Sequence, residues 1–473
     1  MTRLRPLCAL VTLFLTSVLC ADEPAKEKWF YDRAVTISPA PAPLPIFQYR
    51  LYPATTERKD GNAAPIYERF AHERSDARKK NLREKPPEWN QLPLDQLPKE
   101  EVKKFLDEHK YNLKQLELGA RRKTADWNYT LDAGDPIGLR LPDLQEMRMH
   151  AAVLVLKARF EIAQGQYADA VHTLETGFSF SEQIGNNPFL VGSLVAVATA
   201  GLMADTALQL LERNDAPNLY WALSVLPRPM VDMRQAMEFE QTILEGEFPV
   251  MADLDRPRTL EQWEAGLAQF RPRLDQVNDL DRDKKRFIPG TRPGDRAADS
   301  PDLPIARKYL TESVHLADVD KMAPAQVLLL YTSHYYHEIR DDVFKGSYLP
   351  YPEARPLDLA AAERLKSSIH DTEAGRLVKL LLPAILKVRL AGVRLDRKLA
   401  ALRAVEALRM HAAQTGQLPD KLSDVKVVPV PDDPGTGKPF EYSHEGNSAT
   451  LTSRIAGEPL ETSGLRYRIT LRK

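Results

Sequence analysis

The chain has 473 residues, with 65 basic and 66 acidic side chains and a formal net charge of −1 at pH 7. Hydrophobic residues make up 43% of it, so a chain of this length can bury a sizeable core. A near-neutral chain with interspersed charges lacks the concentrated basic surface that nucleic-acid binding uses, so we expect no nucleic-acid partner.

The first 20 residues have the order of parts found in a secretory signal peptide. Two arginines precede an uncharged apolar stretch at residues 7–19, and acidic residues begin at Asp22. The apolar stretch is shorter than the roughly 20 residues that cross a bilayer, so we expect cleavage after Cys20 or Ala21. A retained anchor is the alternative. The expected location is therefore outside the cytoplasm, in the periplasm or the extracellular space.

Both cysteines of the chain, Cys8 and Cys20, lie in this leader. Its removal would leave a mature chain without disulfides, thiolate zinc sites or cysteine nucleophiles. The longest later apolar run, Phe189–Ala204, is shorter than a membrane span and predicts a buried helix. We therefore expect a soluble mature protein without a transmembrane segment.

Composition and hydrophobic periodicity divide the chain into six segments. Prolines dominate the run that begins at Ser38, which predicts extended chain. Alternating apolar and polar residues at 450–453 and 465–472 predict antiparallel strands. In chain order we expect a signal peptide at 1–20, a Pro-rich charged extended region at 21–98, a helical lobe at 99–280, a flexible linker at 281–301, a second helical lobe at 302–416, and a small β element at 417–473.

The expected fold class is mostly α, an antiparallel helical array with a small C-terminal antiparallel β element. Apolar residues that recur every three or four positions predict the helices, and short connections predict antiparallel neighbours. Pro383 falls inside the last helix and predicts a kink there. The predicted helices span 99–110, 112–123, 143–164, 167–184, 189–213, 218–226, 259–270, a segment from 302, 324–344 and 373–415.

The segment VLKARFEIAQGQYADAVHTLETG, which ends at Gly177, resembles a tetratricopeptide unit. In that family small residues such as Ala170 and Gly177 let paired helices approach closely, and an aromatic residue such as Tyr167 lies between them. Glu161 stands where the family has an aromatic residue. The resemblance implies a solenoid-like arrangement, which needs several repeats, and we find one unit here.

A larger set of segments resembles a family of exported bacterial helical proteins to which no activity is assigned. It comprises GNAAPIY from Gly61, the tetratricopeptide-like segment, APNLYWALSVLPRP from Ala216, and QTGQLPDKL with DDPGTGKPFEY near the C-terminus. The last piece is similar to the tail of pseudopilin-type proteins. The membrane-spanning helix of those proteins does not precede it, so the resemblance does not imply assembly into a pilus.

The candidate metal site is SHYYHEIRDD, which begins at Ser333. His334, His337, Glu338 and Asp341 are spaced to share one helix face, and imidazole with carboxylate suits zinc or another divalent ion. The stretch matches neither HExxH nor HxxEH, and an ordinary amphipathic helix explains the same spacing. We therefore expect no bound metal and no cofactor, and keep the metal site as the alternative.

A second candidate is the turn DDPGTGKPFEY near the C-terminus. It fails as a phosphate-binding loop because Pro439 follows Lys438, where such loops have serine or threonine. Asp432 and Asp433 are expected to be solvated, with bound calcium as the alternative.

Two further sets of residues have a structural and a functional interpretation. Four glutamates near the middle of the chain predict a charged helix face, or a carboxylate pair as in glycosidases. A ridge of small residues predicts close helix packing, or a ligand groove. The glutamates are Glu238, Glu240, Glu245 and Glu247, and the ridge is Gly192, Ala196 and Ala200.

The prominent residues are packing residues, so the leading hypothesis is an exported scaffold or protein-interaction protein with a protein partner. The alternative is an exported hydrolase, possibly metal-dependent, with its site between the helical lobes. A scaffold should expose an apolar or aromatic surface. An enzyme should bring His, Asp or Glu side chains from different helices together in a pocket.

Overall fold

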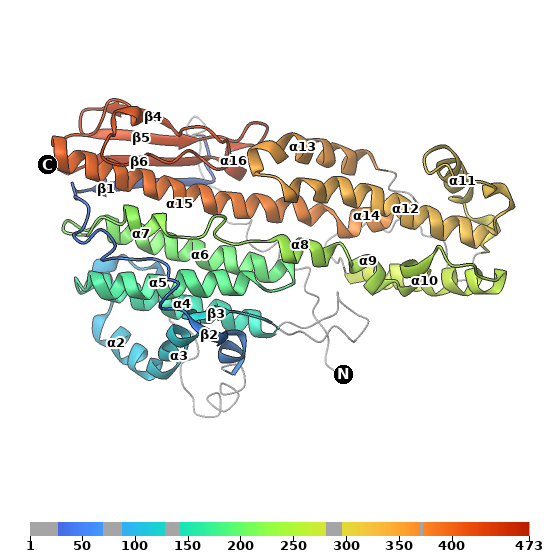
Figure 1. Cartoon of the computed structure of the whole chain (residues 1–473), viewed down its shortest axis with the longest axis horizontal. Helices are drawn as coiled ribbons and strands as arrows, with labels where there is room; N and C mark the ends of the chain where they lie inside the picture. Colours follow the sequence, from blue (N-terminus) through green and yellow to red (C-terminus); the bar gives the residue numbers. More distant parts are fainter. Residues whose placement is uncertain (1–26, 70–87, 128–141, 281–295, 369–371, 473) are drawn as a thin grey trace, which may run out of the picture. The chain divides into compact units, whose positions relative to one another are not determined.

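The computed structural model describes residues 27–69, 88–127, 142–280, 296–368 and 372–472. Helices make up most of these residues, which confirms the mostly α class (Figure 1). The predicted signal peptide at 1–20 lies outside the described residues, as does most of the predicted linker at 281–301.

The described residues form two compact units. The central unit comprises residues 237–387, and the terminal unit combines 24–128, 141–236 and 388–473. The sequence analysis placed a boundary at 281–301 instead. Most of that segment lies outside the described residues, and the described helices before and after it pack together in the central unit. A charged segment rich in glycine and proline can interrupt a helix without separating two compact units, because the units are defined by how their helices pack.

The helices of the terminal unit from α2 to α6 begin and end close to the predicted bounds, whereas α8 and α16 were not predicted and α15 begins later than predicted. Two helices, α8 and α15, cross the boundary between the units. In chain order they are α2 (Lys99–Glu108), α3 (Lys110–Ala120), α4 (Pro142–Ala163), α5 (Tyr167–Gly185), α6 (Leu190–Leu211), α7 (Tyr220–Ser224), α8 (Arg234–Glu240), α15 (Pro383–Thr415) and α16 (Leu460–Ser463).

Helices α4, α5 and α6 pack against one another (Figure 1). Gly165 adopts a positive φ of 74° between α4 and α5, a conformation that glycine provides without strain. A β-carbon at Gly177 would lie 2.2 Å from the sulfur of Met203, so the glycine allows α5 and α6 to approach closely. Ala196 and Ala200 are fully buried, as close helix packing at the small-residue ridge requires.

Helix α6 is also the described helix whose length and apolarity suit a membrane span. Most of its apolar window is buried inside the protein, in contact with α4 and α5. Its hydrophobic residues therefore have protein neighbours to pack against, as the sequence predicted for a buried helix.

A four-stranded mixed sheet lies beside α15 (Figure 1). Strands β4 (Glu441–Glu445), β5 (Ser448–Ser453) and β6 (Leu465–Leu471) are antiparallel, which confirms the predicted C-terminal β element. The fourth strand, β1 (Tyr31–Ile37), was not predicted. It pairs in parallel with β6, from Tyr31 opposite Leu465 to Ile37 opposite Leu471. The sheet is therefore not purely antiparallel.

The N-terminal region also departs from the predicted extended arm. Besides β1 it contains β2 (Lys59–Asn62), which pairs with β3 (Arg122–Thr124). The Trp127 indole N–H donates to the carbonyl oxygen of Gln183 on α5 at 2.8 Å, so the segment after β3 is fixed to the helix core. The partners of these short strands are distant in sequence, and local composition does not reveal them.

The central unit packs four helices around α12 (Pro324–Phe344). Helix α14 ends at Leu381 and α15 begins at Pro383, so the predicted kink is a break between two helices. The other helices of the unit are α9 (Ile243–Glu247), α10 (Leu260–Leu280), α11 (Leu303–Glu312), α13 (Tyr351–Ser367) and α14 (Glu373–Leu381).

Candidate functional site

The two histidines of the predicted metal site lie on α12 in different surroundings. His337 Nε2 is 2.8 Å from a carboxylate oxygen of Glu245 on α9, and its Nδ1 is 3.3 Å from Ser333 Oγ. Burial lowers the pKa of His334, and the nearby His337 lowers it further. One histidine thus meets a carboxylate from another helix.

The carboxylates of the same stretch are engaged elsewhere. Glu338 accepts a hydrogen bond from the hydroxyl of Tyr309 on α11 and forms an ion pair with Arg364 on α13. Asp341 pairs with Arg340 at 2.8 Å. Among the described residues, no group of three or more histidine and carboxylate side chains could hold a metal ion. His337 and Glu338 therefore link α12 to different neighbouring helices, whereas Asp341 pairs within α12.

Three of the four glutamates near the middle of the chain have different surroundings. Glu245 contacts His337, whereas Glu247 is 2% exposed and forms an ion pair with Arg273 of α10. Glu238 is exposed on α8. This arrangement agrees with charged helix faces that link neighbouring helices.

The turn after α15 holds a buried ion pair that the sequence analysis did not predict. Asp433 is fully buried rather than solvated, and its carboxylate lies 3.1 Å from Nε of Arg397, whose side chain is 1% exposed. Asp433 also accepts hydrogen bonds from the Gly435 N–H at 2.8 Å and from the Ser453 hydroxyl. A guanidinium thus occupies the position that the calcium hypothesis gave to a metal ion.

The Pro-rich run that begins at Ser38 ends in an exposed apolar tip. Leu44 is 86% exposed, Ile46 41% and Phe47 56%. Prolines in this run remove backbone donors, and no strand pairing covers it. Large apolar side chains that are grouped and exposed in this way mark interaction sites more often than single exposed ones do.

Aromatic and arginine side chains continue from this tip. The Phe47 ring lies 6.3 Å from Trp221 and the Trp221 ring 5.2 Å from Tyr220 (centroid distances). The Arg50 guanidinium lies 5.9 Å from the Phe47 ring, and that of Arg403 5.9 Å from the Tyr220 ring. Together with Arg228 we call these residues the arginine–aromatic surface, defined as Leu44, Ile46, Phe47, Arg50, Tyr220, Trp221, Arg228 and Arg403. Tyr220 is itself 4% exposed and supports this surface from below.

The three arginines of this surface have no counter-ion among the described residues. Arg50 donates to the carbonyl oxygen of Tyr52 at 3.4 Å and Arg228 to that of Ser224 at 2.9 Å. Arg403 Nε is buried without a hydrogen-bond partner in the described structure. Burial lowers the pKa of Arg403, and the positive charge of Arg228 lowers it further. The surface therefore concentrates positive charge beside apolar groups.

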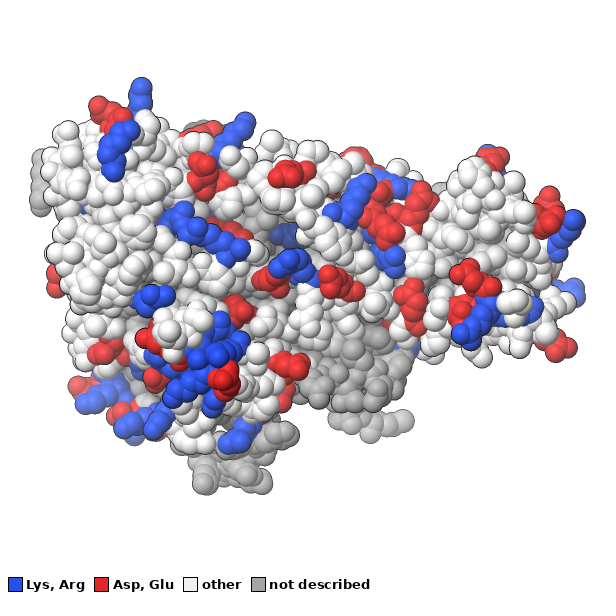
Figure 2. Space-filling view, viewed as in Figure 1, with Lys and Arg blue, Asp and Glu red and all other residues white. Residues whose placement is uncertain are grey.

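Elsewhere the surface charges are mixed. Figure 2 shows lysine and arginine side chains next to aspartate and glutamate side chains over much of the visible face. The distribution agrees with the near-neutral composition of the chain. The arginine–aromatic surface differs from this mixed distribution, because its three arginines have no carboxylate partner among the described residues.

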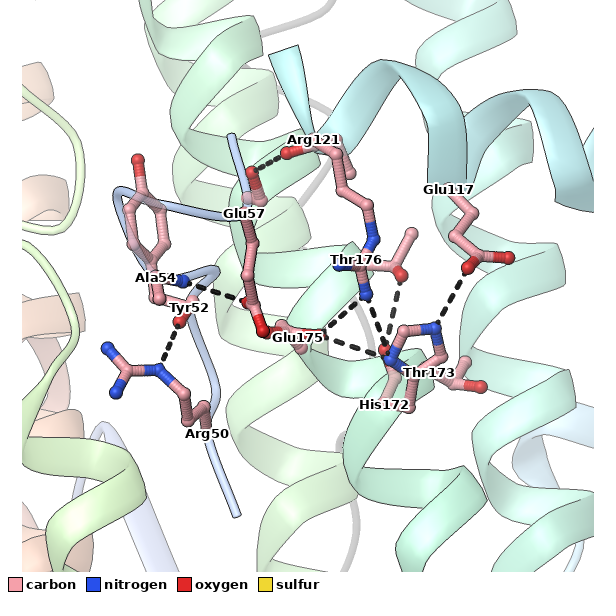
Figure 3. A network of polar contacts seen from close by, with 12 residues as sticks. Arg50, Tyr52, Ala54, Glu57, Glu117, Arg121, His172, Thr173, Glu175 and Thr176 are labelled. Carbon is pink, nitrogen blue, oxygen red and sulfur yellow. Dashed lines mark hydrogen bonds and ion pairs between the residues drawn. The ribbon is translucent and has the colours of Figure 1, made fainter. Parts of the chain in front are cut away.

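A separate polar network joins the N-terminal region and α3 to α5 (Figure 3). His172 Nδ1 lies 3.1 Å from Glu175, and its Nε2 lies 3.1 Å from Glu117 of α3. Arg121 reaches the same Glu175 at 3.5 Å, and its carbonyl oxygen accepts the N–H of Lys59 at 2.8 Å. The imidazole thus bridges two carboxylates on different helices.

The His172 network predicts a pH-dependent contribution to stability. The hydrogen bond to Glu175 raises the pKa of His172; burial opposes the shift, and Glu117 adds to it. Because the folded-state pKa is raised, the stabilisation is present below the ordinary value of about 6.5 and is lost as pH rises through the folded-state pKa. The histidine is 41% exposed, so the effect is limited to about 0.2–1 kcal/mol.

Comparison of the wild type with His172→Gln by urea unfolding measures this contribution. The wild type should be more stable than the variant at about pH 6, and the difference should shrink by about pH 9. His444, which lies on the sheet near Asp420, provides a control position outside the network. A difference between wild type and His172→Gln that is the same at both pH values would contradict the prediction.

Sequence reasoning missed the arginine–aromatic surface and the Arg397–Asp433 pair because their members come from distant segments. The motif APNLYWALSVLPRP contains Tyr220, Trp221 and Arg228, and was the one available signal. Comparison with known proteins adds no assignment: no family model, no curated protein and no solved structure matches this chain.

Proposed function

We propose that the protein is an exported interaction protein that docks a protein partner on the arginine–aromatic surface. The observation that carries the proposal is a group of three arginines without a carboxylate partner in the described structure, beside the exposed Leu44, Ile46 and Phe47. The partner surface that fits is acidic, with an apolar patch.

The composition of this surface matches the energetics of protein interfaces. Tryptophan, tyrosine and arginine are enriched among the residues that contribute most binding energy. A carboxylate of the partner would supply the counter-ion that Arg228 and Arg403 lack within the described chain, and its charge would accelerate association. Burial of Phe47 and Leu44 would add the apolar contribution.

A hydrolase is the weaker alternative. Ser333, His337 and Glu245 form a chain of hydroxyl, imidazole and carboxylate, which is the order of groups in a nucleophilic triad. Ser333 is only 8% exposed, which argues against its hydroxyl as a nucleophile for a substrate carbonyl. By contrast, Leu44, Ile46 and Phe47 of the arginine–aromatic surface are exposed and accessible to a partner.

The test is a quantitative comparison of proteins retained by immobilised variants from the exported fraction. Phe47→Ser with Arg403→Gln should reduce retention of the partner by tenfold or more, since interface hot spots contribute about 2 kcal/mol or more each. Retention by the wild type should also fall with added salt, because the attraction is between exposed charges.

Matched controls come from α3 and α2. Tyr111 is 53% exposed, close to the 56% of Phe47, and Lys104 is exposed on α2. Tyr111→Ser with Lys104→Gln should leave retention unchanged. If the Phe47→Ser/Arg403→Gln variant retains the same proteins in the same amounts as the wild type, the arginine–aromatic surface is not the docking site.

A further inference from the structure

The terminal unit contains a pocket of about 210 Å³ that is separate from the arginine–aromatic surface. Its walls are mainly apolar: Phe30 and Tyr31 from the β1 side, Val197 and Gly201 from α6, and Leu395 from α15. An engineered apolar cavity of about 150 Å³ binds benzene, so this pocket has room for a ligand slightly larger than one aromatic ring.

The absence of a side chain at Gly201 of α6 helps to keep the pocket open. A β-carbon added at Gly201 would meet no heavy atom within 4 Å, whereas one added at Gly177 or Gly192 would lie within 3 Å of a neighbouring side chain. Gly201 lies inside a helix and has no positive φ. Glycine is a poorer helix former than alanine at such a position, and neither backbone conformation nor close packing requires it here.

Cationic side chains line part of the pocket, among them Lys398. The Lys398 side chain is 12% exposed, and its ammonium lies 2.7 Å from Asp205, 3.0 Å from the carbonyl oxygen of Gly201 and 4.7 Å from the centre of the Tyr31 ring. An ammonium has three hydrogen-bond donors, and the third has no hydrogen-bond partner among the described residues. Burial lowers the pKa of Lys398, and Asp205 opposes this shift.

Two arginines lie beside the aromatic rings of the pocket. The Arg394 guanidinium lies 4.2 Å from the centre of the Phe30 ring, and that of Arg33 lies 5.2 Å from the centre of the Tyr31 ring. Asp205 already accepts a hydrogen bond from the Tyr31 hydroxyl at 2.9 Å as well as the contact from Lys398. An anionic ligand group at Lys398 would accept a hydrogen bond from the ammonium donor that neither Asp205 nor the Gly201 carbonyl oxygen uses.

We propose that this pocket binds a small carboxylate with an apolar body, with its carboxylate at Lys398 and its apolar part beside Gly201. This site lies outside the arginine–aromatic surface, so its occupancy does not depend on the proposed protein partner. Benzoate serves as the probe because it combines one ring with one carboxylate.

Isothermal titration calorimetry with three ligands of similar size tests the class of ligand. Benzoate should bind the full-length wild type roughly tenfold more tightly than benzyl alcohol. A difference in affinity of this size is what one hydrogen bond between charged groups contributes. Benzylamine should bind more weakly than both, because its charge is repelled. Equal binding of benzoate and benzylamine, or no binding of benzoate, would overturn the proposal.

Substitutions at Gly201 test the location. Gly201→Leu should fill the pocket and abolish benzoate binding, and Gly201→Ala should weaken binding while raising the melting temperature, since alanine is the better helix former. Ala198→Leu is the matched control, because Ala198 is exposed on the same helix. If Gly201→Ala and Gly201→Leu bind benzoate as tightly as Ala198→Leu does, the pocket is not the binding site.

Discussion

Arg397→Met should lower the free energy of unfolding by about 3–5 kcal/mol, the usual cost of removing one partner from a buried ion pair. The substitution leaves the Asp433 carboxylate without its guanidinium in a fully buried position. It also removes the donors to the Ser463 carbonyl oxygen and to the Ser453 hydroxyl, the latter at 2.6 Å. These bonds connect α15 with the turn at Asp433, with β5 and with the end of α16.

Urea unfolding of three variants separates this effect from a general loss of charge. Arg468→Met removes an exposed arginine that pairs with Asp32 at 3.2 Å, and it should cost about 0–1 kcal/mol. The double variant Arg397→Met/Asp433→Leu should recover part of the loss, because it removes the unpaired charge. A cost for Arg397→Met no larger than that for Arg468→Met would contradict the buried-pair interpretation.

Arg409→Met should have a similar cost in stability and should also disrupt the docking surface. Arg409 is fully buried and pairs with Glu406 at 3.0 Å. It donates to the carbonyl oxygen of Ser38 at 3.0 Å and to that of Ala216 at 2.8 Å. Ser38 precedes the apolar tip, and Ala216 precedes α7, so one side chain positions both parts of the arginine–aromatic surface. We expect a loss of about 3–5 kcal/mol.

Hydrogen exchange together with the retention assay checks this prediction. Exchange of backbone amides near Ser38 should accelerate in Arg409→Met and remain as in the wild type in Phe47→Ser. Both variants should retain less partner, but Arg409→Met alone should unfold at lower urea concentration. If Arg409→Met leaves exchange near Ser38 unchanged, this arginine does not hold the segment in place.

The helices could be predicted from the sequence because their signals are local. Apolar periodicity and terminal residues such as Gly165 indicate where a helix begins or ends, and the structure has helices close to most of those positions. The strands β5 and β6 show strict alternation: Leu465, Tyr467 and Ile469 are buried, whereas Arg466 and Arg468 between them are not. A local sequence pattern is sufficient to predict helices and strands of this kind.

The features that depend on distant partners could not be predicted in this way. Strand β1 is recognisable only beside β6, and Asp433 looks like a solvated turn residue until Arg397 of α15 is placed against it. His337 shares a helix face with Glu338 and Asp341, but its carboxylate partner is Glu245 of another helix. The arginine–aromatic surface has the same origin, since its arginines come from three separate segments.

The pairing of β1 with β6 also has a kinetic consequence. The first described strand has as its neighbour a strand that ends at Leu471, so it gains this neighbour only after nearly the whole chain has been synthesised. Contacts over such sequence separations form slowly, because the entropy of a long loop must be lost before they are made. The sheet of the terminal unit therefore cannot be completed until synthesis has reached Leu471.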